Sequence, residues 1–389
     1  MKIGYILSTP SVAGGANRSL LDLIRELKRR DNNFSCFVIV NAHGTMEDEL
    51  ETLGIKCYVQ TYARAIKGNK KWKTAVKRLF NVYAANRLKK ILKEEKPDII
   101  HNNSLPTTIG MEVAMKEKIP YICHIRENVW SGLGMQFYGA KAVKRIVNHA
   151  SCVMAISDYI NRSYNGFNEN KNTIVLNDGI VTSDYYTPDR NILAEEVTRI
   201  LIVGVINPQK GQKDAVEAAE RLTNKGYNIR LTILGSTGVW QNSTDYADRL
   251  KDYVKERGLT YVNFMEPIGD LAELRDLRSH QDINLICSSA EGLGRTTIES
   301  MLSGSLTIAA DAGATPEIIE DRVSGLLYKS GEVDNLTECI EWALNNRVKA
   351  VAIAEKGQKI ALERFSIEKY AAKVEDIYSD IIKDNNRCK

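Results

Sequence analysis

The segment INLICSSAEGLGRTTIESMLSG, residues 283–304, contains the most informative local pattern in the chain. Its apolar start, residues 283–287, is typical of a buried strand, and the apolar spacing after residue 295 predicts an amphipathic helix. Thr296 and Glu299 fit a capping box in the first turn of that helix. The order is therefore strand, glycine-containing turn and helix, which is the repeating unit of a parallel α/β sheet.

The turn between this strand and helix is suited to hold phosphate or sugar oxygens. Gly292 and Gly294 allow a ligand to approach the backbone closely, and the first-turn N–H groups of the helix have no acceptor within the helix. Arg295 adds a positive charge beside them. Two carboxylates, Glu291 and Glu299, flank the turn, and each can accept hydrogen bonds from two neighbouring hydroxyls of a ribose or hexose. The turn therefore predicts a site for a nucleotide sugar.

Both carboxylates also have a simpler interpretation. Glu299 would cap its own helix and pair with Arg295 four residues before it, and Glu291 would be an ordinary loop carboxylate. The local pattern alone does not decide between the two interpretations, so the rest of the chain has to be considered.

The alternation of strand and helix continues along the whole chain. Strands are expected at residues 3–7, 34–40, 55–59, 98–101, 121–125, 152–156 and 173–176, and again at 199–203, 229–234, 261–264, 284–287, 306–309 and 325–328. Such alternation predicts parallel sheets with helices on both faces, which bind ligands at the carboxyl ends of their strands. With 389 residues, the chain is long enough for two such sheets.

We therefore expect an α/β protein with two Rossmann-like parallel-sheet domains facing each other across a cleft. The amino-terminal domain is expected at residues 1–186 and the carboxyl-terminal domain at 187–365, joined by the turn-rich segment 182–190. The last segment, residues 366–389, is expected to be a helix that packs back on the amino-terminal domain.

Composition and cysteine usage are typical of a folded intracellular protein. Hydrophobic residues make up 43% of the chain and charged residues 26%. The seven cysteines are odd in number and lack CxxC spacing, so we expect reduced thiols and no zinc site. The first apolar run is short and broken by Pro10, and no window reaches eighteen apolar residues. We therefore expect neither a signal peptide nor a membrane span, and a cytoplasmic location.

The turn with its two carboxylates resembles the site of the retaining glycosyltransferases of family 4, which have the two-domain GT-B fold. Further motifs follow the order of that family: Gly14-Gly15, PDIIH (97–101), ISD (156–158), NDGI (177–180), VG (203–204), PQKGQ (208–212), AADAGATPEII (309–319) and SGLL (324–327). The resemblance covers nearly the whole chain and is to the members that make bacterial polysaccharides and glycolipids. It implies transfer of a hexose-type sugar from a nucleoside diphosphate sugar, with UDP-sugar expected ahead of GDP-sugar, and with neither a metal nor another cofactor.

The resemblance also implies roles for individual residues. Glu299 would hold the ribose, Glu291 the sugar hydroxyls and Lys210 the donor diphosphate, while His124 would contact the sugar from across the cleft. A lysine near a helix start is itself unusual, because the helix dipole disfavours a cation there unless an anion is bound. His124, Glu291 and Lys210 are thus the catalytic candidates. The other expected donor-binding residues are Gly15, Gly292, Leu293, Gly294, Arg295 and Ile268, with Ile268 in the loop that would meet the base.

Some positions depart from the family pattern or leave a choice. The chain has Val205 where many members have an arginine after the glycine of the diphosphate motif, so Arg126 or Arg295 is expected to supply a second cation. Glu266 stands where a glycine is frequent. His101 also ends a strand and ranks second to His124. Further candidates, expected on the acceptor side, are Gly14, Arg126 and Asn177.

Simple structural alternatives remain for these residues too. A lone histidine near a core is usually a hydrogen-bonded structural residue, and Lys210 would be a solvated surface lysine. Gly14 and Gly15 would form only a tight strand-to-helix connection. They do not make a GxGxxG fingerprint, which excludes a typical dinucleotide-dependent dehydrogenase. An epimerase with the same fold and a catalytically silent, membrane-docked homologue stay open.

Residues 64–96 are strongly basic. They include twelve lysines and arginines and two glutamates, a net charge of +10, whereas the whole chain carries +4. On a helix, an apolar face would be surrounded by basic residues. The apolar face comprises Trp72, Val76, Leu79, Phe80 and Tyr83, and the basic residues are Lys70, Lys71, Lys73, Lys77 and Arg78.

This basic segment has two interpretations. In the first, its apolar stripe packs inward and its basic face is solvated. In the second, it docks on an anionic membrane surface, the inner face of the cell membrane, which suits a glycan or polyprenyl-diphosphate-linked acceptor. No nucleic-acid partner is expected, because no DNA- or RNA-binding motif accompanies the charge.

Overall fold

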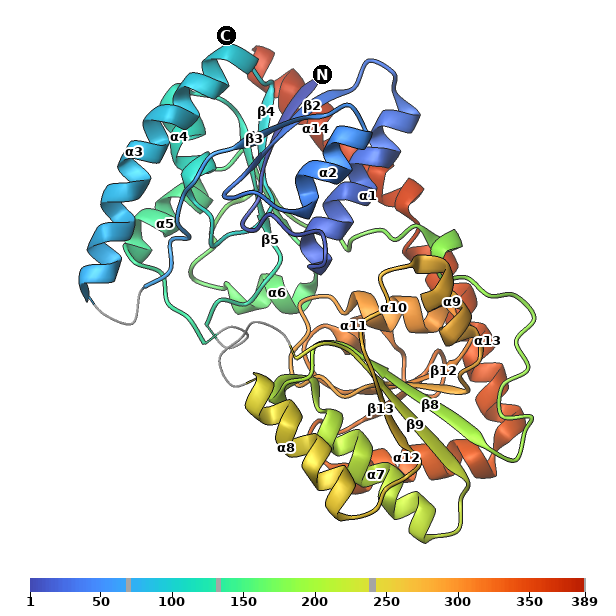
Figure 1. Ribbon diagram of the computed structural model, residues 1–389. Coiled ribbons are helices and arrows are strands. Elements are labelled where there is room, and N and C mark those ends of the chain that lie inside the picture. The colour runs from blue at the N-terminus through green and yellow to red at the C-terminus, as the bar shows by residue number, and fades with distance from the viewer. Residues whose placement is uncertain (68–70, 131–133, 238–242, 388–389) are drawn as a thin grey trace. The chain divides into compact units, whose positions relative to one another are not determined.

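A computed structural model describes residues 1–67, 71–130, 134–237 and 243–387 of the chain (Figure 1). The chain forms two compact units. The first comprises Met1–Ile180 and Ile367–Lys389, and the second comprises Val181–Ser366. In each unit a parallel sheet is covered by helices on both faces (Figure 1).

The first unit contains a parallel sheet with the strand order β3-β2-β1-β4-β5-β6-β7 in the described residues. Its strands are β1 (Lys2–Ile6), β2 (Ser35–Val40), β3 (Lys56–Val59), β4 (Ile99–Asn102), β5 (Tyr121–Ile125), β6 (Cys152–Ala155) and β7 (Thr173–Val175). Its helices are α1 (Gly15–Arg30), α2 (Thr45–Thr52), α3 (Lys71–Glu95), α4 (Ile109–Glu117), α5 (Ala140–Asn148), α6 (Asp158–Ser163) and α14 (Ile367–Arg387). The strand order reverses between β1 and β4, which makes a topological switch point at the carboxyl ends of these two strands.

The second unit repeats this arrangement with the strand order β10-β9-β8-β11-β12-β13. Its strands are β8 (Thr198–Val203), β9 (Ile229–Leu234), β10 (Val262–Met265), β11 (Ile283–Ile286), β12 (Leu306–Ala310) and β13 (Leu326–Tyr328). Its α-helices are α7 (Gln212–Asn224), α8 (Ser243–Glu256), α9 (Leu271–Ser279), α10 (Arg295–Leu302), α11 (Thr315–Ile318), α12 (Val333–Asn345) and α13 (Arg347–Arg364). Two short 3-10 helices, η1 (Thr182–Asp184) and η2 (Pro208–Lys210), complete it. The switch point here lies between β8 and β11.

The expected fold class of two parallel α/β domains is confirmed. Each strand expected from the sequence is present, with its ends within one residue of the expected ones. The reason is that the inner strands, which are buried on both faces, read as short continuous apolar runs that are easy to recognise between turn residues. The structure divides the chain after Ile180, whereas the sequence pattern placed the boundary after residue 186.

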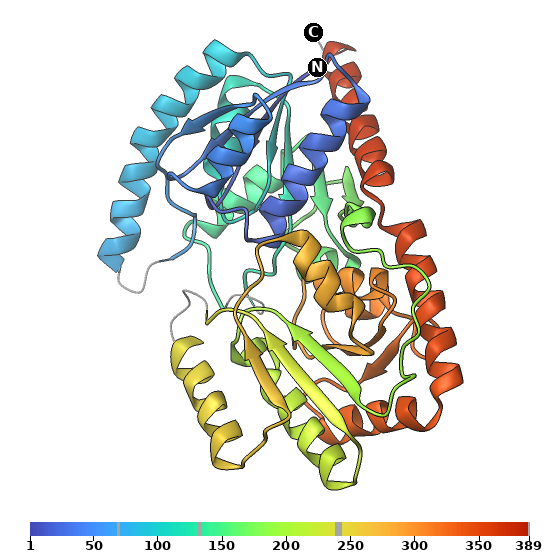
Figure 2. The ribbon, with the colours of Figure 1, turned by 45° about the vertical axis from the view of Figure 1, so that its right-hand side comes forward.

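The carboxyl-terminal helix belongs to the first unit. Figure 2 shows α14 (red) running beside α1 (blue), and α14 packs against that helix. Arg30 of α1 pairs with Glu375 of α14, and buried Tyr378 brings its hydroxyl 3.1 Å from that of Tyr5 in β1. A segment nearly two hundred residues downstream thus completes the core of the first unit.

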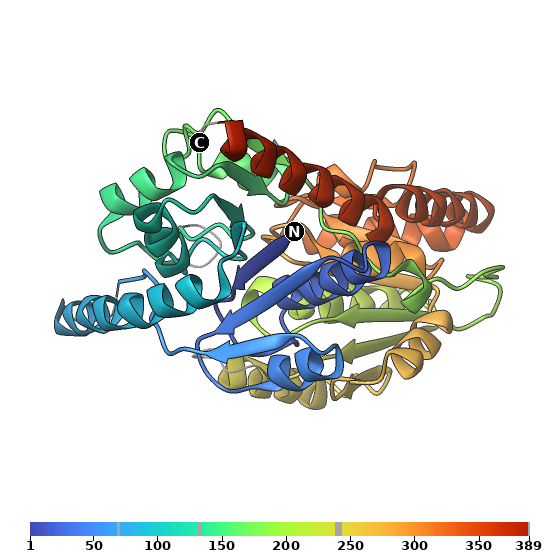
Figure 3. The same ribbon diagram turned by 90° about the horizontal axis from the view of Figure 1, so that it is seen from above.

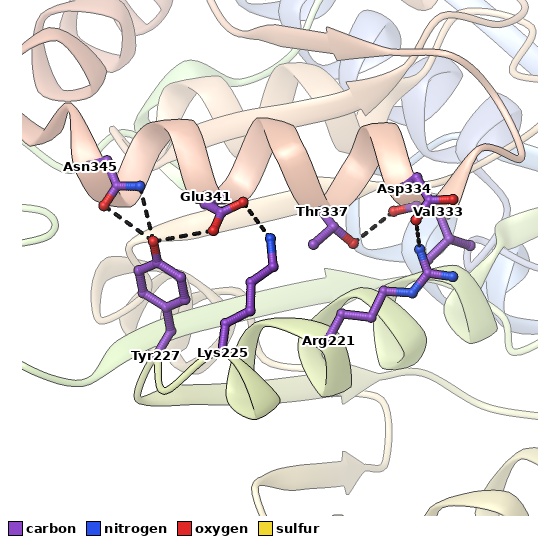
Figure 4. A network of polar contacts seen from close by, with 8 residues as sticks. All are labelled: Arg221, Lys225, Tyr227, Val333, Asp334, Thr337, Glu341 and Asn345. Atoms are coloured by element: carbon purple, nitrogen blue, oxygen red, sulfur yellow. Dashed lines mark hydrogen bonds and ion pairs between the residues drawn. The ribbon is translucent and has the colours of Figure 1, made fainter.

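In the second unit, α7 packs against α12 through buried alanines and leucines, with polar contacts at the rim (Figure 4). Arg221 pairs with Asp334, and Lys225 Nζ lies 2.7 Å from Glu341 Oε2. These pairs are exposed, so each contributes little stability, and apolar burial accounts for most of the packing energy.

Within the described residues, no helix is both long enough and apolar enough to cross a bilayer. Helix α3 extends over 25 residues at the edge of its unit (Figure 3) and carries charged side chains along its length.

Candidate active site

In the second unit, Lys210 and Glu291 form an ion pair at the switch point. Lys210 is the last residue of η2, which follows β8, and Glu291 lies in the loop that follows β11. The ammonium of Lys210 donates to Oε1 of Glu291. Sequence reasoning assigned these side chains to the diphosphate and to the sugar separately, and the structure brings them together. An ammonium has three donors, so this pairing uses only part of its capacity.

The backbone around Lys210 is fixed by local contacts. The side chain of Asn207 accepts a hydrogen bond from the main-chain nitrogen of Lys210 at 3.0 Å. Gly211 follows with a φ of +67°, and a Cβ atom there would overlap the carbonyl oxygen of Cys287 in the β11 loop. Only glycine fits this position without strain, so the loop after β8 lies directly against the loop after β11.

The loop that carries Glu291 is held from two sides. The main-chain nitrogen of Ser289 donates to the carbonyl of Gln209 at 2.9 Å, and the nitrogen of Ala314 donates to the carbonyl of Glu291 at 3.0 Å. Gly313 has a φ of +61°, and a Cβ atom there would come within 2.5 Å of the Glu291 nitrogen. The loops after β8 and β12 therefore hold the main chain around Glu291.

The start of α10 differs from the sequence expectation. The predicted capping box of Thr296 and Glu299 is wrong, because α10 begins at Arg295 with Gly294 as its N-cap and no side-chain cap bond. Gly294 has a φ of +91°, a left-handed conformation that glycine adopts without steric cost and that turns the chain into the helix. Glu299 is therefore left to make other contacts.

Two arginines hold Glu299. Arg295 Nε donates to Oε1 at 3.2 Å, which is the i,i+4 pairing weighed as the simpler alternative. Arg278 Nη2 donates to Oε2 at 3.1 Å. The side chain of Glu299 is 12% exposed. A carboxylate has about four lone-pair directions, so two charged donors orient it while leaving acceptor capacity for hydroxyls.

Arg278 is a residue that sequence reasoning missed. It lies in α9 with a side chain only 1% exposed, and its Nε and Nη1 atoms have no hydrogen-bond partner among the described residues. The signal was present in the sequence. Arg278 follows Leu271 and Leu274 by seven and four residues, a spacing at which an apolar residue is expected on the inner face of a helix.

The remaining donor-site candidates of the second unit lie in loops that follow strands of its sheet. Gly292 and Leu293 belong to the turn between Glu291 and α10, where Leu293 is buried. Ile268 is half-buried in the loop between β10 and α9. Among the described residues, no group of three or more His, Cys, Asp or Glu side chains could hold a metal ion.

In the first unit, His124 is fully buried in β5 and contacts a second histidine. His101 Nε2 lies 3.1 Å from His124 Nδ1. His124 Nε2 has no hydrogen-bond partner within the described part of the chain. Burial lowers the pKa of His124 well below its usual value, and the positive charge of Arg126 adds to this effect. His124 is therefore a neutral imidazole whose Nε2 atom makes no hydrogen bond to the described residues.

His101 occupies a different position from His124. Both of its nitrogens are within hydrogen-bonding distance of a side chain, Nδ1 of the Tyr378 hydroxyl at 2.6 Å and Nε2 of His124. Burial lowers the pKa of His101 to about 3, so it too is neutral at ordinary pH. Both ring nitrogens of His101 thus contact side chains of its own unit.

Arg126 and Asn177 also make contacts within the first unit. Arg126 pairs with Asp178, and its Nε donates to Asn103 Oδ1 at 2.9 Å. Asn177 Nδ2 donates to the carbonyl of Ile156 at 2.7 Å. The expected second cation for the diphosphate, Arg126, is therefore buried and paired in this structure, while Arg295 pairs with Glu299.

Gly14 and Gly15 lie at the switch point of the first sheet, where Gly14 is the N-cap of α1 and Gly15 its first residue. Neither has a left-handed φ, and a Cβ atom on either would meet no described atom within 4 Å. The described structure thus does not itself require glycine here. The tight-connection explanation is therefore not required by the described contacts, and the ligand-facing role of Gly14 and Gly15 stays a prediction.

Helix α3 contradicts the first interpretation of the basic segment. Its apolar residues face outward: Trp72 is 61% exposed, Leu79 73% and Tyr83 61%. The buried face is instead formed by Ala84, Leu88 and Leu92. Lys70 lies outside the described residues. The apolar residues of the predicted stripe are therefore exposed on α3 and do not pack against the unit.

Comparisons with known proteins identify the family of the chain. Residues 13–183 match the family model "Glycosyltransferase Family 4", and residues 187–360 match the model "Glycosyl transferases group 1". The chain belongs to the family 4 glycosyltransferases. The two models divide it close to the boundary between the two units.

Individual relatives span different shares of this family 4 glycosyltransferase. An alpha-maltose-1-phosphate synthase of Mycolicibacterium smegmatis is 24% identical over 96% of this chain and 97% of its own. The putative glycosyltransferase EpsD of Bacillus subtilis is 29% identical over 45% of this chain and 43% of its own. The crystal structure of Anabaena HepE in complex with UDP-glucose has a TM-score of 0.79 at 21% identity, covering 98% of this chain and 100% of that one. That likeness shows the fold.

Proposed function

We propose that this glycosyltransferase moves a hexose-type sugar from a nucleoside diphosphate sugar to a glycan or polyprenyl-diphosphate-linked acceptor in cell-surface polysaccharide synthesis, with retention of configuration. The observation that carries the proposal is the placement of Lys210, Glu291 and the Glu299 pairings around the β8–β11 switch point. Open parallel α/β sheets bind ligands at that edge. A UDP-sugar is proposed ahead of a GDP-sugar, with support from the UDP-glucose complex of HepE.

The donor nucleotide would be held by charge and by hydroxyl recognition. Glu299, oriented by Arg278 and Arg295, is suited to accept hydrogen bonds from both ribose hydroxyls. Lys210 is suited to turn from Glu291 toward a phosphate, since its ammonium is compact and its stem flexible. The N–H groups in the first turn of α10 add positive potential near the turn of Gly292 and Gly294.

Sugar transfer would need no covalent intermediate on the protein. The bond from the anomeric carbon to the diphosphate oxygen breaks, and a bond from the acceptor oxygen to that carbon forms on the same face. The acceptor proton passes to the leaving diphosphate. Lys210, the α10 amides and the Gly15 amide would stabilise the charge that develops there. Glu291 and His124 are assigned to the sugar, and no step requires a metal ion.

The acceptor would be reached at a membrane. The outward apolar residues of α3 and the net charge of +10 over residues 64–96 complement an anionic lipid surface such as the inner face of the cell membrane. A polyprenyl-linked acceptor remains in that surface, so reversible docking would bring enzyme and acceptor together. No nucleic acid is part of this proposal.

Thermal unfolding with UDP, GDP, ADP and their sugars tests the donor assignment. A ligand at about 100 times its Kd adds about 2.7 kcal/mol to the unfolding free energy. We expect UDP and a UDP-hexose to stabilise the protein most, and transfer to continue in EDTA. Conversion of the nucleotide sugar without any acceptor would instead indicate an epimerase, and binding without any turnover would indicate a silent homologue.

A further inference from the structure

A groove of about 360 Å³ lies between three helices of the first unit. Helix α4 packs against both α3 and α5, and the groove is lined by side chains of all three helices (Figure 1). Its apolar lining includes Val82 and Ala85 of α3, Met115 of α4, and Ala142 and Val143 of α5. Pockets that hold small molecules have volumes of about 300–1,000 Å³ and mainly apolar walls. The groove is therefore large enough for part of an amphiphilic ligand.

Hydrogen bonds fix one wall of this groove. Asn81 of α3 and Tyr138, which lies just before α5, both line it. Asn81 Nδ2 donates to the Tyr138 hydroxyl at 2.9 Å and to the carbonyl of Ala63 at 2.8 Å, while Asn81 Oδ1 accepts from the main-chain nitrogen of Ala63 at 2.8 Å. The amide of Asn81 thus ties α3 to the chain on the other side of the groove.

The charged residues of the groove are mostly basic. The cations are Arg78, Lys116 and Arg145, one from each helix, and the single carboxylate is Glu112. None of the three cations forms an ion pair with another described residue. Glu112 already accepts a hydrogen bond from the Thr108 hydroxyl at 2.6 Å. The lining therefore carries a net charge of +2, which complements an anion.

One rim of the groove joins the exposed apolar residues of α3. Val82 lines the groove and is itself 66% exposed, and its neighbours Leu79 and Tyr83 are exposed too. A ligand whose anionic head lies in the groove would place an apolar tail along this rim. Inorganic phosphate has no apolar part to cover such a rim, whereas a phospholipid has both parts.

We propose that the groove between α3, α4 and α5 binds one molecule of an anionic phospholipid, with its phosphate among Arg78, Lys116 and Arg145 and the first carbons of its chains along Val82. Guanidinium groups and an ammonium suit the charge and hydrogen-bonding geometry of a phosphate. The volume lies at the lower end of the range for small-molecule pockets, which fits a headgroup and not a long polyprenyl chain.

This site deepens the membrane part of the proposed function. Attraction between a basic helix and an anionic surface is unspecific, whereas the groove adds a saturable contact with one lipid molecule. The lipid class follows from the lining of the groove, and only its role in reaching the acceptor rests on the proposed function.

Calorimetry with a monomeric short-chain lipid tests the groove without a membrane. We expect dihexanoyl-phosphatidylglycerol, below the concentration at which it forms micelles, to bind the full-length protein with one molecule per chain. Dihexanoyl-phosphatidylcholine, whose headgroup has no net charge, and glycerol 1-phosphate, which has no chains, should each bind roughly tenfold or more weakly. Equal affinity for either of these two compounds would overturn the proposal.

Three variants separate the groove from general surface charge. Lys116→Gln with Arg145→Gln removes two groove cations, and Ala142→Trp fills the groove without changing its charge. All three positions are exposed, so we expect both proteins to fold. Each should weaken binding of the short-chain anionic lipid by roughly tenfold or more.

Lys141→Gln with Lys171→Gln is the matched control. Both lysines are exposed, belong to the first unit and do not line the groove. This variant removes the same charge as the double groove variant and should bind the lipid as wild type does. Wild-type affinity in either groove variant, or an equal loss in the control, would contradict the proposed site.

Donor binding distinguishes this proposal from the proposed function. The groove lies in the first unit and the donor turn in the second, so the groove variants should keep the wild-type Kd for bare UDP. If the protein binds the short-chain lipid but no nucleoside diphosphate, the proposed function fails and the groove site stands. If it binds UDP and transfers sugar but does not bind this lipid, the groove proposal alone fails.

Discussion

Arg278, with a side chain only 1% exposed, donates from Nη2 to Oε2 of Glu299 at 3.1 Å. A buried guanidinium in α9 thereby orients a carboxylate in α10 that lies 21 residues later in the chain. Arg295 holds the other oxygen of the same carboxylate. Glu299 is thus held in place by two arginines, which would lower the entropic cost of accepting hydrogen bonds from the ribose hydroxyls under the proposed function.

Glu299→Ala should weaken binding of a nucleoside diphosphate by roughly 1.5–3 kcal/mol, because charge-assisted hydrogen bonds to the ribose are lost. Titration calorimetry measures this change. Glu299→Gln, which keeps the shape and one acceptor oxygen, should lose less. An unchanged Kd in a folded Glu299→Ala protein would remove Glu299 from the ribose site.

Glu291→Gln and His124→Ala should slow transfer by roughly a hundredfold or more while changing the Kd for bare UDP little, since both residues are assigned to the sugar and its transition state. Single-turnover rates and calorimetry with the same preparations separate the two effects. Near wild-type transfer in either variant would show that its side chain is not part of the sugar site.

Gly15→Ala should impair donor binding without destabilising the fold. A Cβ atom at this position meets no described atom within 4 Å, and alanine in a helix is favoured over glycine by roughly 0.5–1 kcal/mol. Gly211→Ala provides the contrast, because its φ of +67° and the nearby Cys287 carbonyl make that change destabilising. Thermal unfolding with and without UDP checks both variants. A Gly15→Ala protein with normal affinity would mean that no ligand approaches this turn.

The unfolding free energy should fall as pH falls from 6.5 toward 3. His101 has a pKa of about 3 in the folded protein, against 6.5 when unfolded, and burial lowers the pKa of His124 as well. Below pH 6.5 the unfolded chain therefore binds protons that the folded chain does not. Each such histidine costs about 1.4 kcal/mol per pH unit in this window, and its contribution is fully present above pH 6.5.

Urea unfolding of the full chain at pH 7.5, 6.5 and 5.5 measures this slope. Replacing both buried histidines with glutamine should flatten it, whereas His280→Gln, at an exposed position, should leave it unchanged. A slope that stays the same in the double variant would show that other groups cause the pH dependence.

The membrane proposal predicts that wild-type protein cosediments with anionic vesicles at low salt and dissociates as salt rises, because each basic residue near such a surface contributes about 1 kcal/mol and salt screens it. Lys73→Gln with Arg78→Gln should weaken binding, and so should Leu79→Gln with Tyr83→Gln. Lys77 is left intact, since its Nζ donates to the Ile66 carbonyl at 3.1 Å.

The matched control for this experiment replaces two exposed lysines of the second unit, Lys356 and Lys359 of α13, with glutamine. It removes a similar charge but leaves α3 unchanged, so vesicle binding should persist. If wild-type protein ignores anionic vesicles at low salt, α3 does not dock on lipid, and an acceptor outside the membrane becomes the better proposal.

Sequence alone was sufficient for the fold and for the loops that form the candidate site. The strands appeared as short apolar runs, and the loops after β8 and β11 were recognised from glycines and charged residues close together in the chain. These features depend on neighbours within a few residues, which is the range over which periodicity and turn chemistry act. The capping box at Thr296 was the local prediction that failed, because Gly294 already terminates the turn.

Only the tertiary structure decided which side chains meet. Several contacts join residues from separate elements. They are the pairs Lys210–Glu291 and Arg278–Glu299, and the contacts of His101 with Tyr378 and His124. The outward face of α3 was likewise undecided until the helix was placed against its unit. Such contacts depend on strand order and on how each helix packs on its sheet, and the spacing of residues along a chain carries no information about either.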